Sequence, residues 1–269
     1  MNKQISIIGC GWLGFPLAKH LIKHKFTIKG STRSLEKLEI LRAEDISPYF
    51  VSFENNEIQG ELENCLDQSD TLILNIPPSL RHSPTHDFTK HIELLIPFIE
   101  DARIKQVLFI SSTSVYADSE KIPVITEKSD VNPQSKSGIQ LLKAEQLLQN
   151  NSNFHTTILR FSGLFGNDRH PAKYLSGKTN IKNPTAPVNL IHLNDCIRII
   201  QLIIEHGIWN ETFNVATTSH PLRKDYYTSV CKDLKLAVPK FNVKDSSTGK
   251  LINSEKLVRI LDYAFKVKL

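Results

Sequence analysis

The sequence has little cysteine, and its cysteines are not arranged to act together. Four occur among 269 residues, widely separated and without a C-x-x-C pair: Cys10, Cys65, Cys196 and Cys231. This spacing argues against a disulfide framework and favours free thiols in a reducing compartment, so we expect a cytoplasmic protein. No group of His, Cys, Asp and Glu has the spacing of metal ligands, and we expect no metal.

Long apolar runs and basic runs are also missing. Nowhere do about 18 apolar residues follow one another, and the apolar stretch at Ile5–Ile8 is too short for a signal peptide, so no membrane partner is expected. The 33 Lys and Arg exceed the 28 Asp and Glu, but they are scattered along the chain. Nucleic acid is therefore not expected as a partner. A G-x-S-x-G elbow, which would indicate a hydrolase, is absent.

Short apolar runs alternate with helical periodicity over the first 160 residues. Strands are expected at Ile5–Ile8, Phe26–Lys29, Tyr49–Val51, Thr71–Leu74, Val107–Ile110 and Thr157–Leu159. Helices are expected at Pro16–His24, Leu35–Arg42, Asp87–Ala102, Gln134–Asn150 and Asp195–Ile204. This alternation predicts an α/β fold, a Rossmann-like doubly wound parallel sheet with helices on both faces.

The pattern becomes irregular after the sixth strand, where Gly, Pro and Lys collect between Gly163 and Pro187. We predict a sheet domain over residues 1–162 and a smaller part over residues 163–269 that packs on the carboxyl edge of the sheet. Ligands of open α/β sheets bind at that edge, so the smaller part is expected to bind the substrate. No linker separates the two parts, and a single cooperative unit is expected.

A glycine motif follows the first predicted strand and begins the first helix. It reads Gly9-Cys10-Gly11-Trp12-Leu13-Gly14 and matches G-x-G-x-x-G. Gly9 would allow the tight turn, Gly11 the approach of a pyrophosphate, and Gly14 the close packing of helix on strand, while Trp12 and Leu13 begin the helix that faces the phosphates. The motif in this context predicts a bound dinucleotide. A glycine-rich turn without a ligand is the alternative.

The end of the second strand lacks the acid that usually binds the ribose of NAD. The segment reads Gly30-Ser31-Thr32-Arg33, and no carboxylate occurs before Glu36. A guanidinium at Arg33, with the hydroxyls of Ser31 and Thr32, suits a 2′-phosphate. We therefore expect NADP(H) to be preferred over NAD(H). A helix cap followed by a solvated arginine is the alternative.

Three later segments, together with the glycine motif, resemble the extended short-chain dehydrogenase/reductase family, which includes nucleotide-sugar epimerases and dehydratases. They are Ser111–Tyr116, Leu159–Gly166 and Val188–Asp195. The runs Gly11–Gly14, Arg169–Pro171 and Ser176–Thr179 resemble an atypical subgroup of that family. The resemblance spans nearly the whole chain and implies an NAD(P)-binding Rossmann domain. It does not supply a substrate, because one fold serves many reactions.

The catalytic residues that the resemblance implies are only partly present. Active members combine a Ser or Thr at the end of the fifth strand with Tyr-x-x-x-Lys on the next helix, and Ser112 matches the first of these. When Glu145 is aligned with the family's helix acid, Ser137 and Leu141 occupy the Tyr and Lys positions. Tyr116 is the best substitute proton donor, although an aromatic side chain packed under the loop is the more favoured interpretation.

Other candidate residues flank the expected site. Ser111, Ile76 and Pro77 end strands at the cofactor edge and are expected to contact the dinucleotide. His170 and Lys178 could hold a phosphate or carboxylate of a substrate, and His192 could contribute as well; solvation or packing is the alternative for each. A Tyr-x-x-x-Lys spacing occurs at Tyr174 and Lys178, but Gly177 makes a matching helix improbable.

Two functions remain open from the sequence. The first is an NADP(H)-dependent oxidoreductase or epimerase/dehydratase-like enzyme that acts on a small polar or sugar-like substrate. The second is a non-catalytic NADP(H)-binding protein that senses redox state, which the missing Tyr and Lys favour. A homodimer is compatible with either.

Overall fold

The protein is described by a computed structural model that covers residues 3–54, 57–78, 87–166 and 168–269. The chain folds into two compact units, each assembled from separate segments. Unit 1 comprises residues 1–112, 135–159 and 200–212, and unit 2 comprises residues 113–134, 160–199 and 213–269. The predicted boundary at residue 162 stays a prediction.

An eight-stranded sheet has the order β11-β8-β6-β5-β1-β2-β3-β4. Its strands are β1 (Gln4–Ile8), β2 (Thr27–Thr32), β3 (Ser47–Glu54), β4 (Glu57–Gly60), β5 (Thr71–Leu74), β6 (Gln106–Ser112), β8 (His155–Phe161) and β11 (Thr212–Val215). The interior strands are almost wholly buried, and β5 is buried along its whole length. This is why they appear in the sequence as continuous apolar runs.

The strand pairs from β6 through β5, β1 and β2 to β3 are parallel. The prediction of an α/β doubly wound sheet is therefore confirmed, with one correction. β4 pairs antiparallel with β3 at the edge of the sheet. The four residues of β4 are mostly exposed, so no apolar run in the sequence indicates this strand.

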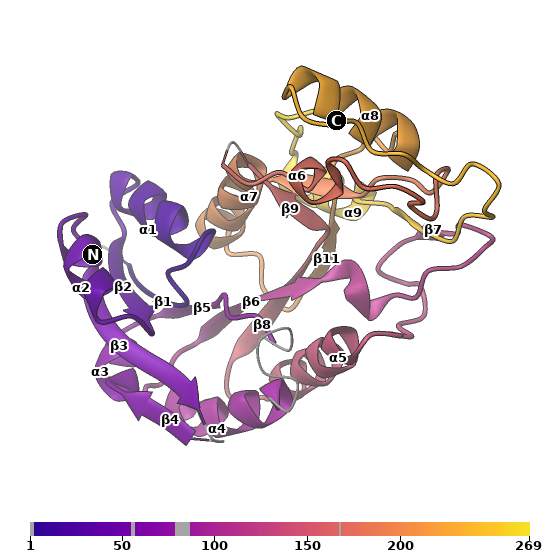
Figure 1. Ribbon diagram of the computed structural model, residues 1–269. Coiled ribbons are helices and arrows are strands. Elements are labelled where there is room, and N and C mark those ends of the chain that lie inside the picture. The colour runs from indigo at the N-terminus through magenta and orange to yellow at the C-terminus, as the bar shows by residue number, and fades with distance from the viewer. Residues whose placement is uncertain (1–2, 55–56, 79–86, 167) are drawn as a thin grey trace. The chain divides into compact units, whose positions relative to one another are not determined.

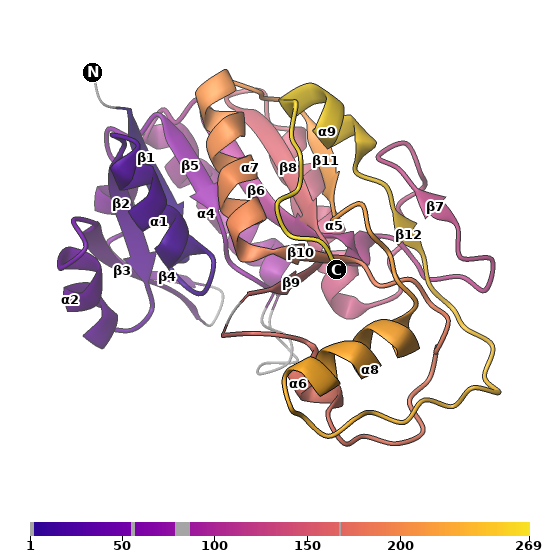
Figure 2. The same cartoon turned by 90° about the horizontal axis from the view of Figure 1, so that it is seen from above.

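The helices of unit 1 cover both faces of its strands. They are α1 (Gly14–Lys23), α2 (Glu36–Arg42), α3 (Leu62–Leu66), α4 (Phe88–Asp101) and α5 (Lys136–Gln149). α1 lies on one face, and α4 and α5 lie side by side on the other (Figures 1 and 2). Each long helix begins and ends within three residues of its predicted bounds.

Unit 2 contains short elements that the sequence did not indicate. Its strands form two further parallel pairs, β9 (Gly163–Phe165) with β10 (Leu190–His192), and β7 (Val124–Ile125) with β12 (Leu251–Ile252). Its other elements are a 3-10 turn (Thr113–Val115) and the helices α6 (Ala172–Leu175), α8 (Arg223–Asp233) and α9 (Glu255–Leu261). α7 (Leu193–His206) begins in unit 2 and ends in unit 1.

A small core holds unit 2 together around α8. It consists of the buried side chains of Phe165, Ala172, Val188, Leu190, Tyr226, Tyr227 and Cys231. All four cysteines of the chain are buried and unpaired, as expected. Over the described residues, no helix is both long enough and apolar enough to cross a bilayer.

Candidate functional site

The glycine loop between β1 and α1 fits too tightly for side chains at two positions. Gly9 has φ of +105°, and a Cβ there would lie 2.4 Å from the carbonyl oxygen of Asn75. A Cβ on Gly14 would lie 2.2 Å from the carbonyl oxygen of Gly9. The turn and the helix–strand contact therefore both require glycine, as the motif predicts.

Gly11 differs from its neighbours because it faces open space. A Cβ there would have no atom within 4 Å, and the residue is exposed. Within the described part of the chain, the backbone N–H groups of Gly11 and Leu13 donate to no protein acceptor. This end of α1 therefore presents backbone donors, and the positive end of the helix dipole, beside a position without a side chain.

Two side chains fix the loop from neighbouring strands. The Oγ of Ser31, on β2, accepts a hydrogen bond from Gly9 N at 3.0 Å, and its carbonyl accepts one from Cys10 N at 2.8 Å. From the residue after β5, Asn75 Nδ2 donates to Gly9 O at 2.9 Å. The sequence places Asn75 next to the expected cofactor residues Ile76 and Pro77, but it does not reveal this positioning contact, which depends on the pairing of β1 with β5.

The end of β2 leads directly to Arg33. Thr32 Oγ1 accepts a hydrogen bond from Ser34 N at 3.2 Å and is nearly buried. Arg33 is exposed, and among the described residues it has no carboxylate partner. The guanidinium is therefore available to an anionic ligand, and the hydroxyls of Ser31 and Thr32, which accept hydrogen bonds from backbone N–H groups, keep their own O–H donors.

The remaining predicted cofactor residues occupy the ends of β5 and β6. Ile76 is half-buried, with its Cγ2 3.2 Å from the place of a Gly9 Cβ, and Pro77 is exposed. Ser111 is 5% exposed, and its Oγ donates to the carboxylate of Glu145 on α5 at 2.5 Å. The Ser111 hydroxyl thus joins β6 to α5 inside unit 1.

The predicted catalytic residues of unit 1 are Ser112 and its expected partners on α5. Ser112 is the last residue of β6 and is half-buried. Ser137 and Leu141 both lie on α5, four residues apart, and Leu141 is 5% exposed. α5 therefore presents no Tyr-x-x-x-Lys pair, and an apolar side chain occupies the lysine position.

Tyr116, in unit 2, has its hydroxyl surrounded by protein groups. The Oη accepts from Arg160 Nη1 at 2.6 Å and donates to Asn214 Oδ1 at 2.9 Å. The residue is 2% exposed. Burial raises the pKa of the phenol, and the charge of Arg160 opposes this shift only in part. These contacts favour the packing role over the role of proton donor.

The predicted substrate residues of unit 2 fall into two groups. His170 and His192 each pack edge-on against Phe165, with ring centroids 5.3 Å and 5.0 Å from the centroid of its ring. Lys178 is exposed and lies beyond the end of α6. Tyr174 and Lys178 do not share a helix, because α6 ends at Leu175 and Gly177 has φ of +71°.

A buried carboxylate fixes the C-terminal tail of unit 2. Asp195 lies in the first turn of α7, because the helix begins at Leu193. Its Oδ1 accepts from Tyr263 Oη at 2.5 Å and from Lys266 N at 2.8 Å, and its Oδ2 accepts from Val267 N at 3.3 Å. Burial, reinforced by this carboxylate, raises the pKa of the Tyr263 phenol.

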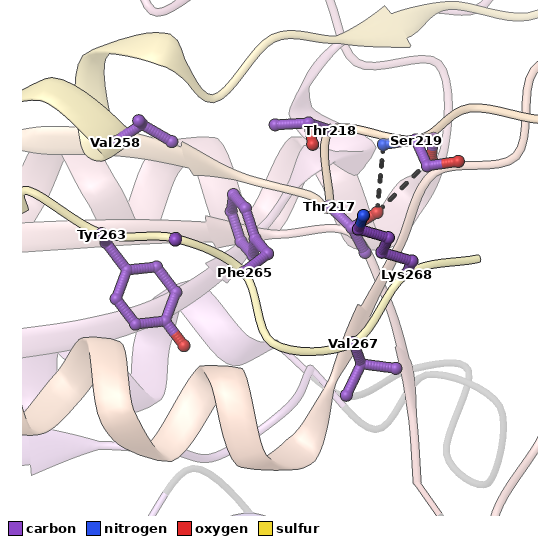
Figure 3. Close-up of a pocket in the computed structure, with 9 residues that line it drawn as sticks. Thr217, Thr218, Ser219, Val258, Tyr263, Phe265, Val267 and Lys268 are labelled. Carbon is purple, nitrogen blue, oxygen red and sulfur yellow. Dashed lines mark hydrogen bonds between the residues drawn. The ribbon is translucent and has the colours of Figure 1, made fainter.

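The tail borders an open pocket of about 390 Å³ within unit 2 (Figure 3). Its walls are Val258 of α9, the segment after β11 and the tail itself, and they include Thr217, Thr218, Ser219, Tyr263, Ala264, Phe265, Val267 and Lys268. None of the predicted site residues lines it. Across the residues that the structure describes, no group of three His, Cys, Asp or Glu is placed to hold a metal ion.

Comparisons with known proteins agree on one family. The family model described as the NAD dependent epimerase/dehydratase family matches residues 5–216. Protein YeeZ of Escherichia coli (strain K12) is 31% identical over 270 residues, which cover 98% of this chain and 96% of YeeZ. The resemblance seen in the sequence is thereby confirmed.

Solved structures of low sequence identity share the fold. UDP-N-acetylglucosamine 4-epimerase from Bacillus cereus has a TM-score of 0.79 at 18% identity, covering 99% of this chain and 92% of that one. UDP-glucuronic acid 4-epimerase from Bacillus cereus, solved in complex with NAD, has a TM-score of 0.77 at 18% identity. The match covers 98% of this chain and 94% of that one. Because the family model spans most of the chain and the relative nearly all of it, the chain belongs to the NAD dependent epimerase/dehydratase family.

Proposed function

We propose that the chain binds NADP(H) at the glycine loop of unit 1 and acts as an oxidoreductase or epimerase/dehydratase-like enzyme on a small polar or sugar-like substrate. The observation that carries the proposal is the contrast within the loop. Gly9 and Gly14 are enclosed by backbone, whereas Gly11 leaves open space in front of backbone donors. A diphosphate needs this combination of room and N–H groups.

The bound dinucleotide would supply or accept hydride. Gly11 and Leu13 would hold its diphosphate through backbone N–H groups, with Trp12 between them in the same turn, while Ser31 and Asn75 keep the loop in shape. Ile76, Pro77 and Ser111 are proposed to border it at the ends of β5 and β6. Ser112 would donate a hydrogen bond to a substrate oxygen, which is the task of the family's Ser or Thr at this place.

The preference for NADP(H) rests on Arg33. Unit 1 offers no acid at the end of β2, and the exposed guanidinium of Arg33, directly after this strand, is the group proposed to bind the 2′-phosphate of NADP. Calorimetric titration of NADPH and NADH should therefore give tighter binding of NADPH. Arg33→Gln should weaken NADPH by about 10-fold or more, since a charge-assisted hydrogen bond contributes about 1.5–3 kcal/mol.

Lys37→Gln is the matched control, because it also removes one exposed positive charge from the start of α2. It should leave the affinity for both nucleotides nearly unchanged. Equal or tighter binding of NADH by the wild type would contradict the preference for NADP(H). No binding of either nucleotide would contradict the proposed function itself.

A second candidate is a non-catalytic NADP(H)-binding protein, and the composition of α5 favours it. Leu141 cannot donate to a nicotinamide ribose, and the hydroxyl of Ser137 is far too weak an acid to replace a tyrosine. Product analysis distinguishes the two candidate functions. The NADPH-loaded protein is incubated with UDP-sugars and carbonyl compounds, and the products are identified. Turnover that Ser112→Ala abolishes supports the enzyme, and binding without turnover supports the sensor.

We further propose that the protein works in the cytoplasm, in line with its four unpaired cysteines. A homodimer stays a prediction, and analytical ultracentrifugation of the purified chain measures it directly.

A further inference from the structure

The open pocket of unit 2 has one wall that is formed by the C-terminal tail and held by Asp195. The buried carboxylate of this residue accepts hydrogen bonds from Tyr263 Oη, Lys266 N and Val267 N. Because these bonds already order the tail, a ligand that binds against it does not have to supply the free energy of ordering. The tail therefore forms a preorganised wall.

The opposite wall is the segment after β11, and it is also fixed by hydrogen bonds (Figure 3). Thr217 N donates to Leu190 O at 2.9 Å. Thr217 Oγ1 accepts from Ser219 N at 3.2 Å and donates to Ser219 O at 3.4 Å, which closes a tight turn. The hydroxyls of Thr218 and Ser219 form no hydrogen bond with any described residue, so this wall offers two donors to a ligand.

Lys268 is the one charged residue among the described residues that line the pocket. Figure 3 shows its side chain directed from the tail toward Thr217. Lys268 forms no ion pair within the described part of the chain, whereas Lys250 of the same unit pairs with Asp118 at 2.8 Å. The polar side of the pocket therefore combines one ammonium group with two hydroxyls, a set of donors that suits an anionic oxygen.

The rest of the lining is apolar. It consists of Val258 of α9 and, from the tail, Ala264, Phe265 and Val267, next to Tyr263, whose hydroxyl is already bonded to Asp195. The volume of about 390 Å³ lies within the range of small-molecule pockets, about 300–1,000 Å³. Such pockets combine an apolar lining with a few polar groups that orient the ligand.

We propose that this pocket binds a small ionised carboxylic acid with an aliphatic or aromatic body. The carboxylate would contact Lys268, Thr218 and Ser219, and the body would pack on Phe265 and Val267. A phosphate group carries a charge near −2, and a single exposed lysine matches it less well than it matches a monoanion. The inference goes beyond the proposed function, because the pocket lies within unit 2 and no group of the glycine loop takes part in it.

The first test titrates octanoate, acetate and octan-1-ol into the ¹⁵N-labelled protein. These probes carry the carboxylate and the chain together, the carboxylate alone and the chain alone. Octanoate should bind at least about 10-fold more tightly than acetate, because burial of two CH₂ groups accounts for that much. Its amide shifts should include Thr218, Ser219 and Phe265. Equal binding of acetate, shifts confined to other residues, or no saturable shift overturns the proposal.

The second test removes the charge. Lys268→Gln should weaken octanoate by about 5-fold, the upper range for an exposed ion pair, and should leave octan-1-ol unchanged. Lys266→Gln is the matched control, because this exposed lysine belongs to the same tail and its side chain does not line the pocket. An equal loss in both variants, or no loss in Lys268→Gln, overturns the contact between Lys268 and the carboxylate.

The third test fills the pocket. Ala264→Phe adds a ring to its lining and should weaken both octanoate and octan-1-ol by about 10-fold or more. Ala237→Phe is the matched control, since Ala237 is an exposed alanine of unit 2 outside the pocket, and it should bind like the wild type. Thermal melting checks that both variants fold.

Full affinity for octanoate in Ala264→Phe overturns the assignment of the pocket. None of these measurements needs a dinucleotide. Failure of NADPH to bind would therefore refute the proposed function without touching this inference, and failure of octanoate would refute this inference alone.

Discussion

Unit 1 and unit 2 present their polar groups in different ways. In unit 1 the candidate site consists of main-chain N–H groups around Gly11, and side chains such as Asn75 serve to hold the loop. In unit 2 side chains bind one another, as Tyr116 binds Arg160 and Asn214, and main-chain N–H groups orient the rings of His170 and His192. A main-chain site depends on glycine spacing, which the sequence displays. A side-chain site depends on tertiary contacts, which it does not.

The two units also differ in charge. Unit 1 contains 14 Lys and Arg against 17 Asp and Glu, whereas unit 2 contains 19 against 11, so the whole positive excess belongs to unit 2. An anionic dinucleotide would bind a unit of net negative charge. Local groups must therefore supply the attraction, and the start of α1 and Arg33 are the groups placed to do so.

The largest effect is expected from a side chain on the glycine loop. Gly9→Ala forces a residue with Cβ to φ of +105° and against Asn75 O, so unfolding free energy should fall by about 3 kcal/mol. Dinucleotide affinity should fall with it. Chemical denaturation and calorimetric titration measure the two effects.

Gly11→Ala is the matched variant, because its Cβ meets no atom within 4 Å. It should leave stability nearly unchanged and still weaken the dinucleotide, since the methyl group occupies the space proposed for the diphosphate. Full affinity in Gly11→Ala would show that unit 1 does not use this main-chain site.

In unit 2 a comparable loss of stability is expected from removing one side chain, the buried carboxylate of Asp195. Asp195→Ala leaves Tyr263 Oη, Lys266 N and Val267 N without their acceptor, and this should cost about 3 kcal/mol of unfolding free energy. Asp195→Asn keeps one acceptor oxygen and should cost less. Denaturant melts of both variants test this order, and equal stability of Asp195→Ala and wild type would refute it.

The sequence predicts unit 1 better than unit 2, because local patterns specify a main-chain site but not contacts between distant side chains. The glycine loop, the buried strands and the long helices of unit 1 were predicted because their signals are local: three glycines, apolar runs and helical periodicity. β4 was not predicted, because an exposed edge strand has no run of apolar residues. The contacts of Tyr116 with Arg160 and Asn214 span 44 and 98 residues, and no local pattern indicates them.

Tyr116→Phe tests whether the Tyr116 hydroxyl in unit 2 has a structural role or acts as a proton donor. Removal of the hydroxyl leaves Arg160 and Asn214 short of a partner, so unfolding free energy should fall by about 1–2 kcal/mol. Turnover, once a substrate is found, should stay within a factor of about 3 of the wild type, because general acid catalysis would account for about 100-fold or more. A loss of about 100-fold at unchanged substrate affinity would instead make Tyr116 the proton donor.

The smallest expected effect is a pH dependence that belongs to unit 2. Burial lowers the pKa of His170 from its usual 6.5, so below pH 6.5 the unfolded chain takes up a proton before the folded one does. Stability should therefore fall as the pH drops from about 7 to about 5, by no more than about 1.4 kcal/mol per pH unit for this residue. His170→Gln should reduce that slope without abolishing it, because burial also lowers the pKa of His220. Replacing the exposed His206 by Gln is the control, and an equal reduction there would show that the slope does not come from His170 and His220.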